Sequence, residues 1–368
     1  MKKLTVLMPA YNVEDYISQA IESVLMQNVD FEYELLIIDD KSTDNTLKIA
    51  LEYQQKYPEK IAVIKNDVNM RTLAATIKGY EITKTDYFCV LDPDDYYIKD
   101  DFFKKAIEFL DQNSKYTLYC NNSYVLDTKT QKKQKFIHSD HSEKTFVLED
   151  LVKGNAILAN TTSTVFRNVV FRECVPADLY NAVNTYSEKS FEGDGFRNFL
   201  HLSKGAGYFS AEIVAVYRVT HDGVWTSLPD VKKDLMQAQL YRDMNVFFKD
   251  LTISDFMLNQ SYKYFKQMLL GLMSSYTLRD SRTREVSLPS HFINFLQVDK
   301  LYEHYSNNYE SLIAEGDWDQ FILEKDKLLS ERESQIRSLT ASYENSLSWR
   351  ITKPLRFVRA ILSFKNKS

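Results

Sequence analysis

Hydrophobic positions in the first hundred residues alternate between two periods. Short apolar runs with the length of buried strands occupy residues 4–8, 34–38, 61–65 and 87–91. Between these runs, apolar side chains recur every three or four residues, as on one face of an amphipathic helix, over residues 14–26, 45–57 and 72–83. Strands separated by helices of this length predict parallel pairing through right-handed crossovers, and therefore an α/β fold.

The pattern changes twice further along the chain. Strand-like runs and one short helical stretch are mixed over residues 116–225, and the sequence turns helical, with few Gly or Pro, from 231 to 310. We therefore predict three parts: an α/β domain over 1–228, a helical domain over 229–320, and a charged helix with a basic amphipathic tail over 321–368. The charged helix has apolar positions spaced by seven, so it would pair two chains into a homo-oligomer or fold back on its own chain.

Carboxylates directly follow two of the predicted strands. Asp39 and Asp40 follow the second strand, and Asp92, Asp94 and Asp95 follow the fourth. In open parallel sheets, ligands bind beyond the carboxyl ends of the strands. Three neighbouring carboxylates repel one another, and Mn²⁺ or Mg²⁺ with a bound diphosphate would compensate that repulsion, because these ions complete their shell with phosphate oxygens. The alternative for an Asp-Pro-Asp stretch alone is a solvated turn.

The loop after the first strand, residues 9–12, adds an aromatic side chain at the same predicted edge. Tyr11 can stack on a nucleotide base, and Asp40 can accept a hydrogen bond from a ring N–H of that base. Each has an ordinary alternative, since Tyr11 can pack on the sheet and Asp40 can cap the following helix. Three such loops at one edge favour nucleotide binding.

Together these segments resemble glycosyltransferase family 2, the inverting enzymes with a GT-A fold, which is Rossmann-like with a mostly parallel sheet flanked by helices. The resemblance covers residues 1 to about 225, in Pro-Ala-Tyr-Asn, the helix 19–27, Ile-Ile-Asp-Asp-Lys-Ser-Thr-Asp, Asn69 with Gly79, and Leu-Asp-Pro-Asp-Asp. It implies nucleotide contacts from Pro9, Tyr11, Asp40 and Asp92. It also implies that Asp92 and Asp94 hold the metal, with Asp95 as a further candidate.

The loop before the third predicted helix often carries a basic residue near the nucleotide in similar proteins. Arg71 occupies that place here, either as a nucleotide contact or as a surface arginine. Many relatives have Arg-Asn inside this helix, where this chain has Ala75 and Thr76. A diphosphate or sugar contact is therefore absent here or made differently.

Residues 190–196 resemble the Glu-Asp element of the family, with Gly193 inserted between the two acids. The family implies that the Asp is the general base, which deprotonates the acceptor hydroxyl while the metal stabilises the departing diphosphate. We expect Asp194 in this role. Glu192 is the rival because the insertion blurs the register, and both acids would otherwise cap the helix that follows.

Residues 215–225 resemble the Tyr-Arg-x-His stretch that closes the catalytic domain in many relatives. There Arg218 would hold a phosphate, and His221 would ligate the metal or the diphosphate, the alternative being a structural histidine. Trp225 would stack on a sugar face or pack at the edge of the core.

Charge and composition add what the motifs leave open. The formal net charge of −5 argues against a general nucleic-acid binder. The last nineteen residues carry six cations and no acid, interleaved with large apolar side chains, which is typical of a helix in an anionic membrane interface. Similar tails occur on cell-envelope glycosyltransferases and fit a lipid-linked acceptor. The alternative is a helix that docks on the protein or on a second subunit.

Cellular location follows from three features of the sequence. The three cysteines have no paired spacing, no signal peptide precedes residue 9, and no run of eighteen apolar residues occurs. These features predict a cytoplasmic protein, peripheral at the inner face of the plasma membrane through its tail.

The function that we expect is an inverting glycosyltransferase, dependent on Mn²⁺ or Mg²⁺, that moves a sugar from a UDP-linked donor to a hydroxyl of a glycan or lipid-linked acceptor in cell-surface polysaccharide synthesis. One alternative is a non-catalytic nucleotide-sugar-binding assembly partner. A nucleotidyltransferase is less favoured, because it would need a glycine-rich, cationic phosphate loop near the first strand, and residues 9–15 contain neither glycine nor a cation.

Overall fold

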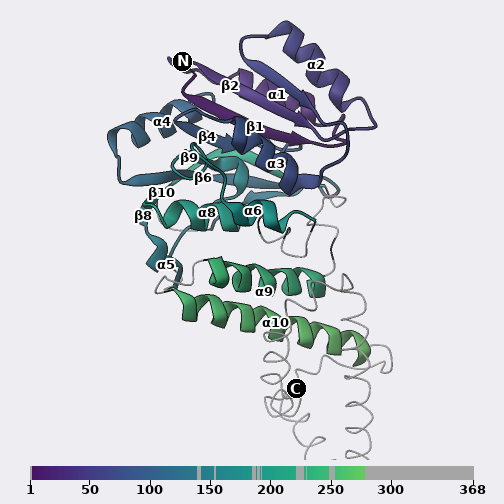
Figure 1. The fold of residues 1–368 in the computed structure, drawn as a ribbon, viewed down its shortest axis with the longest axis vertical. Helices are drawn as coiled ribbons and strands as arrows, with labels where there is room; N and C mark the ends of the chain where they lie inside the picture. Colours follow the sequence, from purple (N-terminus) through teal and green to yellow (C-terminus); the bar gives the residue numbers. More distant parts are fainter. Residues whose placement is uncertain are drawn as a thin grey trace, which may run out of the picture. The chain divides into compact units, whose positions relative to one another are not determined.

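The computed structural model of the chain describes residues 2–138, 142–152, 155–184, 188, 191, 193–220, 228, 230–247 and 253–277 (Figure 1). These residues belong to a compact unit that spans Met1–Arg282, and the second unit is Thr283–Ser368. The predicted charged helix and basic tail therefore lie outside the described residues. The division into three parts at 228 and 320 stays a prediction.

A mixed sheet of ten strands forms the centre of the first unit. Its strand order is β3-β2-β1-β4-β9-β6-β10-β5, with β7 paired to β6 and β8 paired to β10. The strands are β1 (Leu4–Ala10), β2 (Tyr33–Asp39), β3 (Ile61–Lys65), β4 (Tyr87–Val90), β5 (Tyr96–Tyr97), β6 (Tyr116–Asp127), β7 (Lys133–Lys135), β8 (Glu143–Phe146), β9 (Thr164–Arg167) and β10 (Ala206–Val219).

The predicted parallel half is confirmed, because β1 pairs in parallel with both β2 and β4, and β2 pairs in parallel with β3. Strand β9 runs antiparallel between β4 and β6, and β10 pairs in parallel with β6. The fold is therefore the GT-A type that the sequence predicts, an α/β fold with a mixed, largely parallel sheet and flanking helices.

Helices cover both faces of this sheet. In chain order they are α1 (Ile17–Leu25), α2 (Thr46–Lys56), α3 (Arg71–Ile82), α4 (Phe102–Gln112), α5 (Leu148–Val152), α6 (Ala177–Ala182), α8 (Asp194–Leu202), α9 (Asp230–Phe247) and α10 (Ser254–Thr277). Alternate residues of β1 pack into two separate cores: Val6 joins one with α1 and α4, and Leu7 joins the other with α3 and α8. This is the period of two expected of a strand that is buried on both faces.

The predicted helical character after residue 230 is confirmed in α9 and α10. The two helices lie side by side (Figure 1). Helix α9 packs on α8, where Phe196 meets Phe247 at a ring distance of 5.2 Å and Phe199 meets Tyr241 at 6.5 Å.

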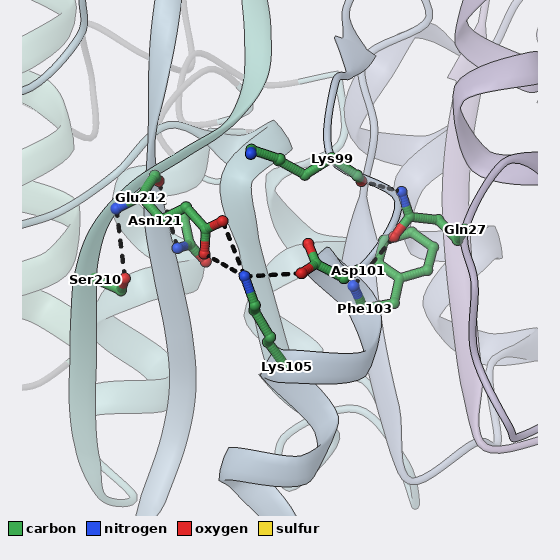
Figure 2. A network of polar contacts seen from close by, with 8 residues as sticks. All are labelled: Gln27, Lys99, Asp101, Phe103, Lys105, Asn121, Ser210 and Glu212. Atoms are coloured by element: carbon green, nitrogen blue, oxygen red, sulfur yellow. Dashed lines mark hydrogen bonds and ion pairs between the residues drawn. The ribbon is translucent and has the colours of Figure 1, made fainter.

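A polar network joins helix α4 to the sheet and to α1 (Figure 2). The Lys105 ammonium lies 2.8 Å from a carboxylate oxygen of Asp101 and 2.8 Å from one of Glu212 on β10. Gln27, just beyond α1, donates to the carbonyl of Lys99 at 2.6 Å and accepts from the amide of Phe103 at 3.1 Å. These contacts hold the β5–α4 connection, which follows the aspartate loop.

Candidate active site

The sheet opens between β1 and β4, at the point where the strand order reverses. The last pair between these strands is Leu7 with Val90, followed by one bond from the Leu91 amide to the Leu7 carbonyl. The backbone of Pro9 points toward β4, as that of Leu7 does, but Pro9 lies beyond the last pair of these two strands. The N–H that proline lacks is therefore not needed for a hydrogen bond between β1 and β4. A crevice at such a reversal is where open α/β sheets bind ligands.

Hydrogen bonds join the loops after β1 and β2. Asn12, with a φ of 52°, accepts the amide of Thr43 at 2.8 Å, and the Val13 amide donates to the Thr46 hydroxyl at 2.8 Å. Tyr11 makes none of these hydrogen bonds between the two loops, and it is 47% exposed. The ring is therefore free to meet a planar ligand, which fits its predicted role.

Asp40 organises the next loop from a buried position. One carboxylate oxygen accepts from the Asn66 amide group at 2.9 Å and from the Met70 amide at 2.8 Å, and the other accepts from the Arg71 amide at 2.8 Å. A carboxylate has about four acceptor positions, so one position on the second oxygen is left for a ligand N–H.

Arg71 starts α3 in the left-handed region, with a φ of 68°. Such a conformation is costly for a side chain larger than glycine, and it persists where the surroundings impose it. Here the bond from its amide to Asp40 does so. The guanidinium is largely exposed and lies 3.9 Å from the buried carboxylate of Glu188, so Arg71 is more than an isolated surface arginine.

Three carboxylates gather in the loop between β4 and β5. Burial, with the charges of Asp94 and Asp194, raises the pKa of Asp92 to about 7 against the opposing charge of Arg197. Burial also raises the pKa of Asp94, against the lowering effect of its own backbone amide and Arg218. The ionised form of both carboxylates is therefore disfavoured at this loop.

Asp95 is fully buried and is held by the protein itself. It accepts the Thr162 hydroxyl at 2.5 Å and the Arg218 amide at 2.8 Å. Its pKa lies well above the ordinary value because of burial and the charges of Asp92 and Asp94. Asp95 therefore positions the loop, whereas Asp92 and Asp94 are only half-buried.

Arg218 is already engaged by protein groups. Its guanidinium donates to the carbonyl of Asp94 and to the side chain of Gln19. It also lies over the rings of Tyr96, at 4.4 Å, and Tyr16, at 5.2 Å. These contacts secure the aspartate loop, and a phosphate contact from Arg218 stays a prediction.

Helix α8 brings a fourth acid to the three carboxylates of the loop. Asp194 is its first residue, and its charge acts on the pKa of Asp92. Three residues later, buried Arg197 donates to the Tyr80 hydroxyl at 2.9 Å and to the Thr161 hydroxyl at 3.1 Å. Burial by itself lowers the pKa of Arg197, but Tyr80, Asp194 and Asp92 together hold it above the usual value.

Three residues near the carboxylates were not predicted from the sequence: Thr162, Arg197 and Tyr217. Tyr217 on β10 faces the cluster, since burial and the charges of Asp95, Asp92, Asp94 and Asp194 raise its pKa to about 12. For Arg197, the available signal is its position one helical turn after Asp194, which puts both on neighbouring parts of one face. No sequence signal marks Thr162.

Three predicted site residues, Glu192, His221 and Trp225, lie outside the described residues. Within the described part of the chain, no group of three or more His, Cys, Asp or Glu side chains is arranged to hold a metal ion. The same residues include no helix that is both long and apolar enough to span a bilayer.

The fold described above is of the GT-A type, and comparison with known proteins adds the class of activity. Residues 5–174 match the family described as Glycosyl transferase family 2. This match covers slightly less than half of the chain, and together with the names of its relatives it identifies the chain as a glycosyltransferase.

Some relatives are also named as glycosyltransferases. The uncharacterized glycosyltransferase MG025 homolog of Mycoplasma pneumoniae is 28% identical over 254 residues, which are 68% of this chain and 79% of the relative. The poly(ribitol-phosphate) beta-glucosyltransferase of Bacillus spizizenii is 38% identical over 96 residues, 26% of this chain and 15% of the relative. Among solved structures, the mannosyltransferase PcManGT from Pyrobaculum calidifontis, in complex with GDP-Man and Mn²⁺, has a TM-score of 0.50 at 12% identity and covers 83% of each chain.

Proposed function

We propose that this glycosyltransferase is inverting and metal-dependent, and that it transfers a sugar from a nucleotide-sugar donor to a hydroxyl of a glycan or lipid-linked acceptor in cell-surface polysaccharide synthesis. The observation that carries the proposal is the convergence of Asp92, Asp94 and Asp194 beside the crevice between β1 and β4. The name of the Bacillus spizizenii relative, a poly(ribitol-phosphate) beta-glucosyltransferase, supports the cell-surface acceptor.

The nucleotide would lie over the loops after β1 and β2. Tyr11 offers an exposed ring for stacking on the base, and Asp40 keeps one acceptor position for a ring N–H such as that of uracil. Arg71 places an exposed cation at the same edge, next to the Asp40 carboxylate that fixes its backbone. These three residues would form a site for the base and the phosphates.

The residues present fit a divalent cation. Burial raises the pKa of Asp92 and of Asp94, and the charges of Asp94 and Asp194 add to this effect at Asp92. A cation at these two carboxylates would favour their ionised forms. When bound, Mn²⁺ or Mg²⁺ supplies electrostatic stabilisation of the departing diphosphate. The complex of PcManGT with GDP-Man and Mn²⁺ supports this assignment.

Asp194 would act as the general base. It begins α8, and its charge acts on Asp92, so it lies close to the carboxylates of the β4–β5 loop. Proton removal during attack on the anomeric carbon gives inversion in a single displacement. Buried Arg197, fixed by Tyr80 and Thr161, holds a positive charge close to Asp92 and Asp194.

A donor panel tests the proposal. The full chain is incubated with Mn²⁺ or Mg²⁺ and UDP-, GDP-, dTDP- and CDP-sugars, and released nucleotide is measured. We expect release from one donor, lost in Asp94→Ala and reduced about 100-fold or more in Asp194→Asn. Asp30→Ala serves as the matched control, because Asp30 is exposed and precedes β2 at the opposite edge of the sheet.

Two outcomes would count against the proposal. Full activity in Asp194→Asn with loss in Glu192→Gln would transfer the base role to Glu192. No release from any donor, together with no metal-dependent nucleotide binding, would leave a non-catalytic assembly partner as the better description.

A further inference from the structure

A basic hairpin lies beside the carboxylate site and takes no part in the mechanism above. It consists of the end of β6, a turn over residues 128–132, and β7. Residues 128–138 contain no acid, and their cations besides His138 are Lys129, Lys132, Lys133 and Lys135, all exposed. Asp127, the last residue of β6, accepts the backbone amides of Lys129 and Thr130 within the turn. None of these four lysines pairs with a carboxylate of the described residues. In a chain of net charge −5, this is a local excess of positive charge.

Strand register fixes where the hairpin lies. Arg218 on β10 is paired with Leu126 on β6, and Leu126 is paired with Lys133 on β7. Two strand spacings are about 10 Å, and the amide of Arg218 is the group that bonds to Asp95. The hairpin lysines are therefore about 10 Å to the side of the strand that holds the aspartate loop.

Aromatic side chains connect the two regions. The ring of Phe136, just after β7, packs edge-on against Tyr217 at 6.3 Å, and Tyr217 is the tyrosine that faces the aspartates. Phe136 is itself 38% exposed. A ligand that leaves the site past Tyr217 would next meet Phe136 and then the lysines.

The lysines of β7 form a row. Lys133 and Lys135 are two residues apart, so they lie on one face of the strand at a spacing of about 7 Å. The ammonium of Lys133 is 4.1 Å from the centre of the Tyr124 ring, and Tyr124 is paired with Lys135. Two lysines in line along a strand suit a ligand with repeated anionic groups better than a single small anion.

We propose that the β6–β7 hairpin binds the acceptor, and that the acceptor is a polyanionic chain, with phosphodiester groups along the hairpin lysines and its sugar-accepting hydroxyl at Asp194. This inference rests on the proposed function and names its substrate class. Lysines on an edge strand also discourage pairing between sheets. That role alone requires no affinity for a ligand, so binding separates the two explanations.

The test is a binding measurement that needs no sugar transfer. A fluorescent synthetic glycerol-phosphate oligomer is titrated with the full-length protein, and its anisotropy is followed at fixed salt. Lys133→Gln/Lys135→Gln is compared with Lys48→Gln/Lys56→Gln, which removes the same charge from exposed positions on α2. Both variants keep the six cations of residues 350–368, so any binding there is a common background.

We expect the hairpin pair to weaken oligomer binding about tenfold and to flatten its salt dependence, whereas the α2 pair leaves both unchanged. A neutral maltooligosaccharide of similar length should not bind through the hairpin. Equal affinities in the two pairs would overturn the proposal. So would a loss of binding to phosphatidylglycerol vesicles without a loss for the oligomer, because the hairpin would then be a membrane contact. Donor hydrolysis, measured separately, reports on the proposed function alone.

Discussion

The aspartates of the β4–β5 loop differ in what surrounds them. Asp95 receives two hydrogen bonds from Thr162 and Arg218 and is closed off by the protein. Asp92 and Asp94 are half-buried, and burial raises the pKa of each more than the nearby Arg197 and Arg218 lower it. Asp95 therefore stabilises the loop, whereas Asp92 and Asp94 are left to meet ligands.

Buried His201 allows a test of fold stability that does not depend on the proposed active site. Burial among Phe88, Phe166 and Phe171 lowers its pKa to about 3, and its Nδ1 lies 2.8 Å from the carbonyl of Arg197. The unfolded chain takes up a proton at this histidine below about pH 6.5, whereas the folded chain does not. The free energy of unfolding should therefore fall as pH drops, by about 2 kcal/mol between pH 6.5 and 5 from this group.

Urea unfolding at pH 7 and pH 5 measures this slope. His201→Gln should be less stable at pH 7 but should lose less stability on acidification than the unmodified chain. Exposed His138 offers the control, and His138→Gln should keep the original slope. An unchanged slope in His201→Gln would mean that another group is responsible.

The residues that sequence reasoning identified and those that it missed differ in kind. Asp40 and Asp92 were identifiable because they follow strands of high apolar content, and strand ends fix their place. Arg197 and Thr162 were not, because they meet the aspartates through tertiary packing of α8 and of the turn before β9. Their partners are distant along the chain, and one sequence does not contain that pairing.

At the level of elements, α8 combines site and core. Asp194 begins it, Arg197 lies one turn later, and His201 lies a further turn on, among the rings of the core. A tight turn at Gly205 connects α8 to β10. A Cβ at Gly205 would lie 2.6 Å from the backbone carbonyl of Lys115 and 2.7 Å from the Thr117 methyl.

Gly205→Ala should therefore destabilise the fold by about 1–3 kcal/mol, because a backbone atom has to move. Gly193→Ala is the matched control, since nothing lies within 4 Å of a Cβ there. Thermal unfolding of both variants decides the matter. Equal melting temperatures would show that the turn relaxes without cost.

Elements with a strong period were predicted closely. The strand predicted at 61–65 is Ile61–Lys65, and the helix predicted at 72–83 is Arg71–Ile82. Helix α4 was not predicted, although Phe103, Ile107 and Leu110 have helical spacing. The antiparallel direction of β9 was not predictable, because a buried run of apolar residues does not encode the direction of its neighbours.

For the whole molecule, we expect the carboxylate cluster to lower the stability of the ligand-free chain and to be required for ligand binding. Asp92→Asn should raise the free energy of unfolding of the ligand-free chain by about 1 kcal/mol at pH 8, because one repelling charge is removed. UDP with Mn²⁺ at about 100 times its dissociation constant should stabilise the unmodified chain by about 2.7 kcal/mol, and Asp92→Asn should lose most of that gain.

Melting temperatures with and without UDP and Mn²⁺ test this reversal, and EDTA should abolish the ligand effect. Asp30→Asn is the control, with the shift of the unmodified chain. A lower melting temperature for ligand-free Asp92→Asn would contradict the repulsion on which the metal assignment depends.

The pairing of β10 with β6 has a consequence for biosynthesis. Gly207 is paired with Leu118, and Arg218 bonds to Asp95 across a sequence separation of 123 residues. A nascent chain that has not yet delivered β10 from the ribosome has an open edge on β6 and an Asp95 without its Arg218 contact. The aspartate loop thus gains its Arg218 contact only when β10 arrives, and in a chain that ends before residue 206 the Thr162 hydroxyl alone of these two donors is present to bond Asp95.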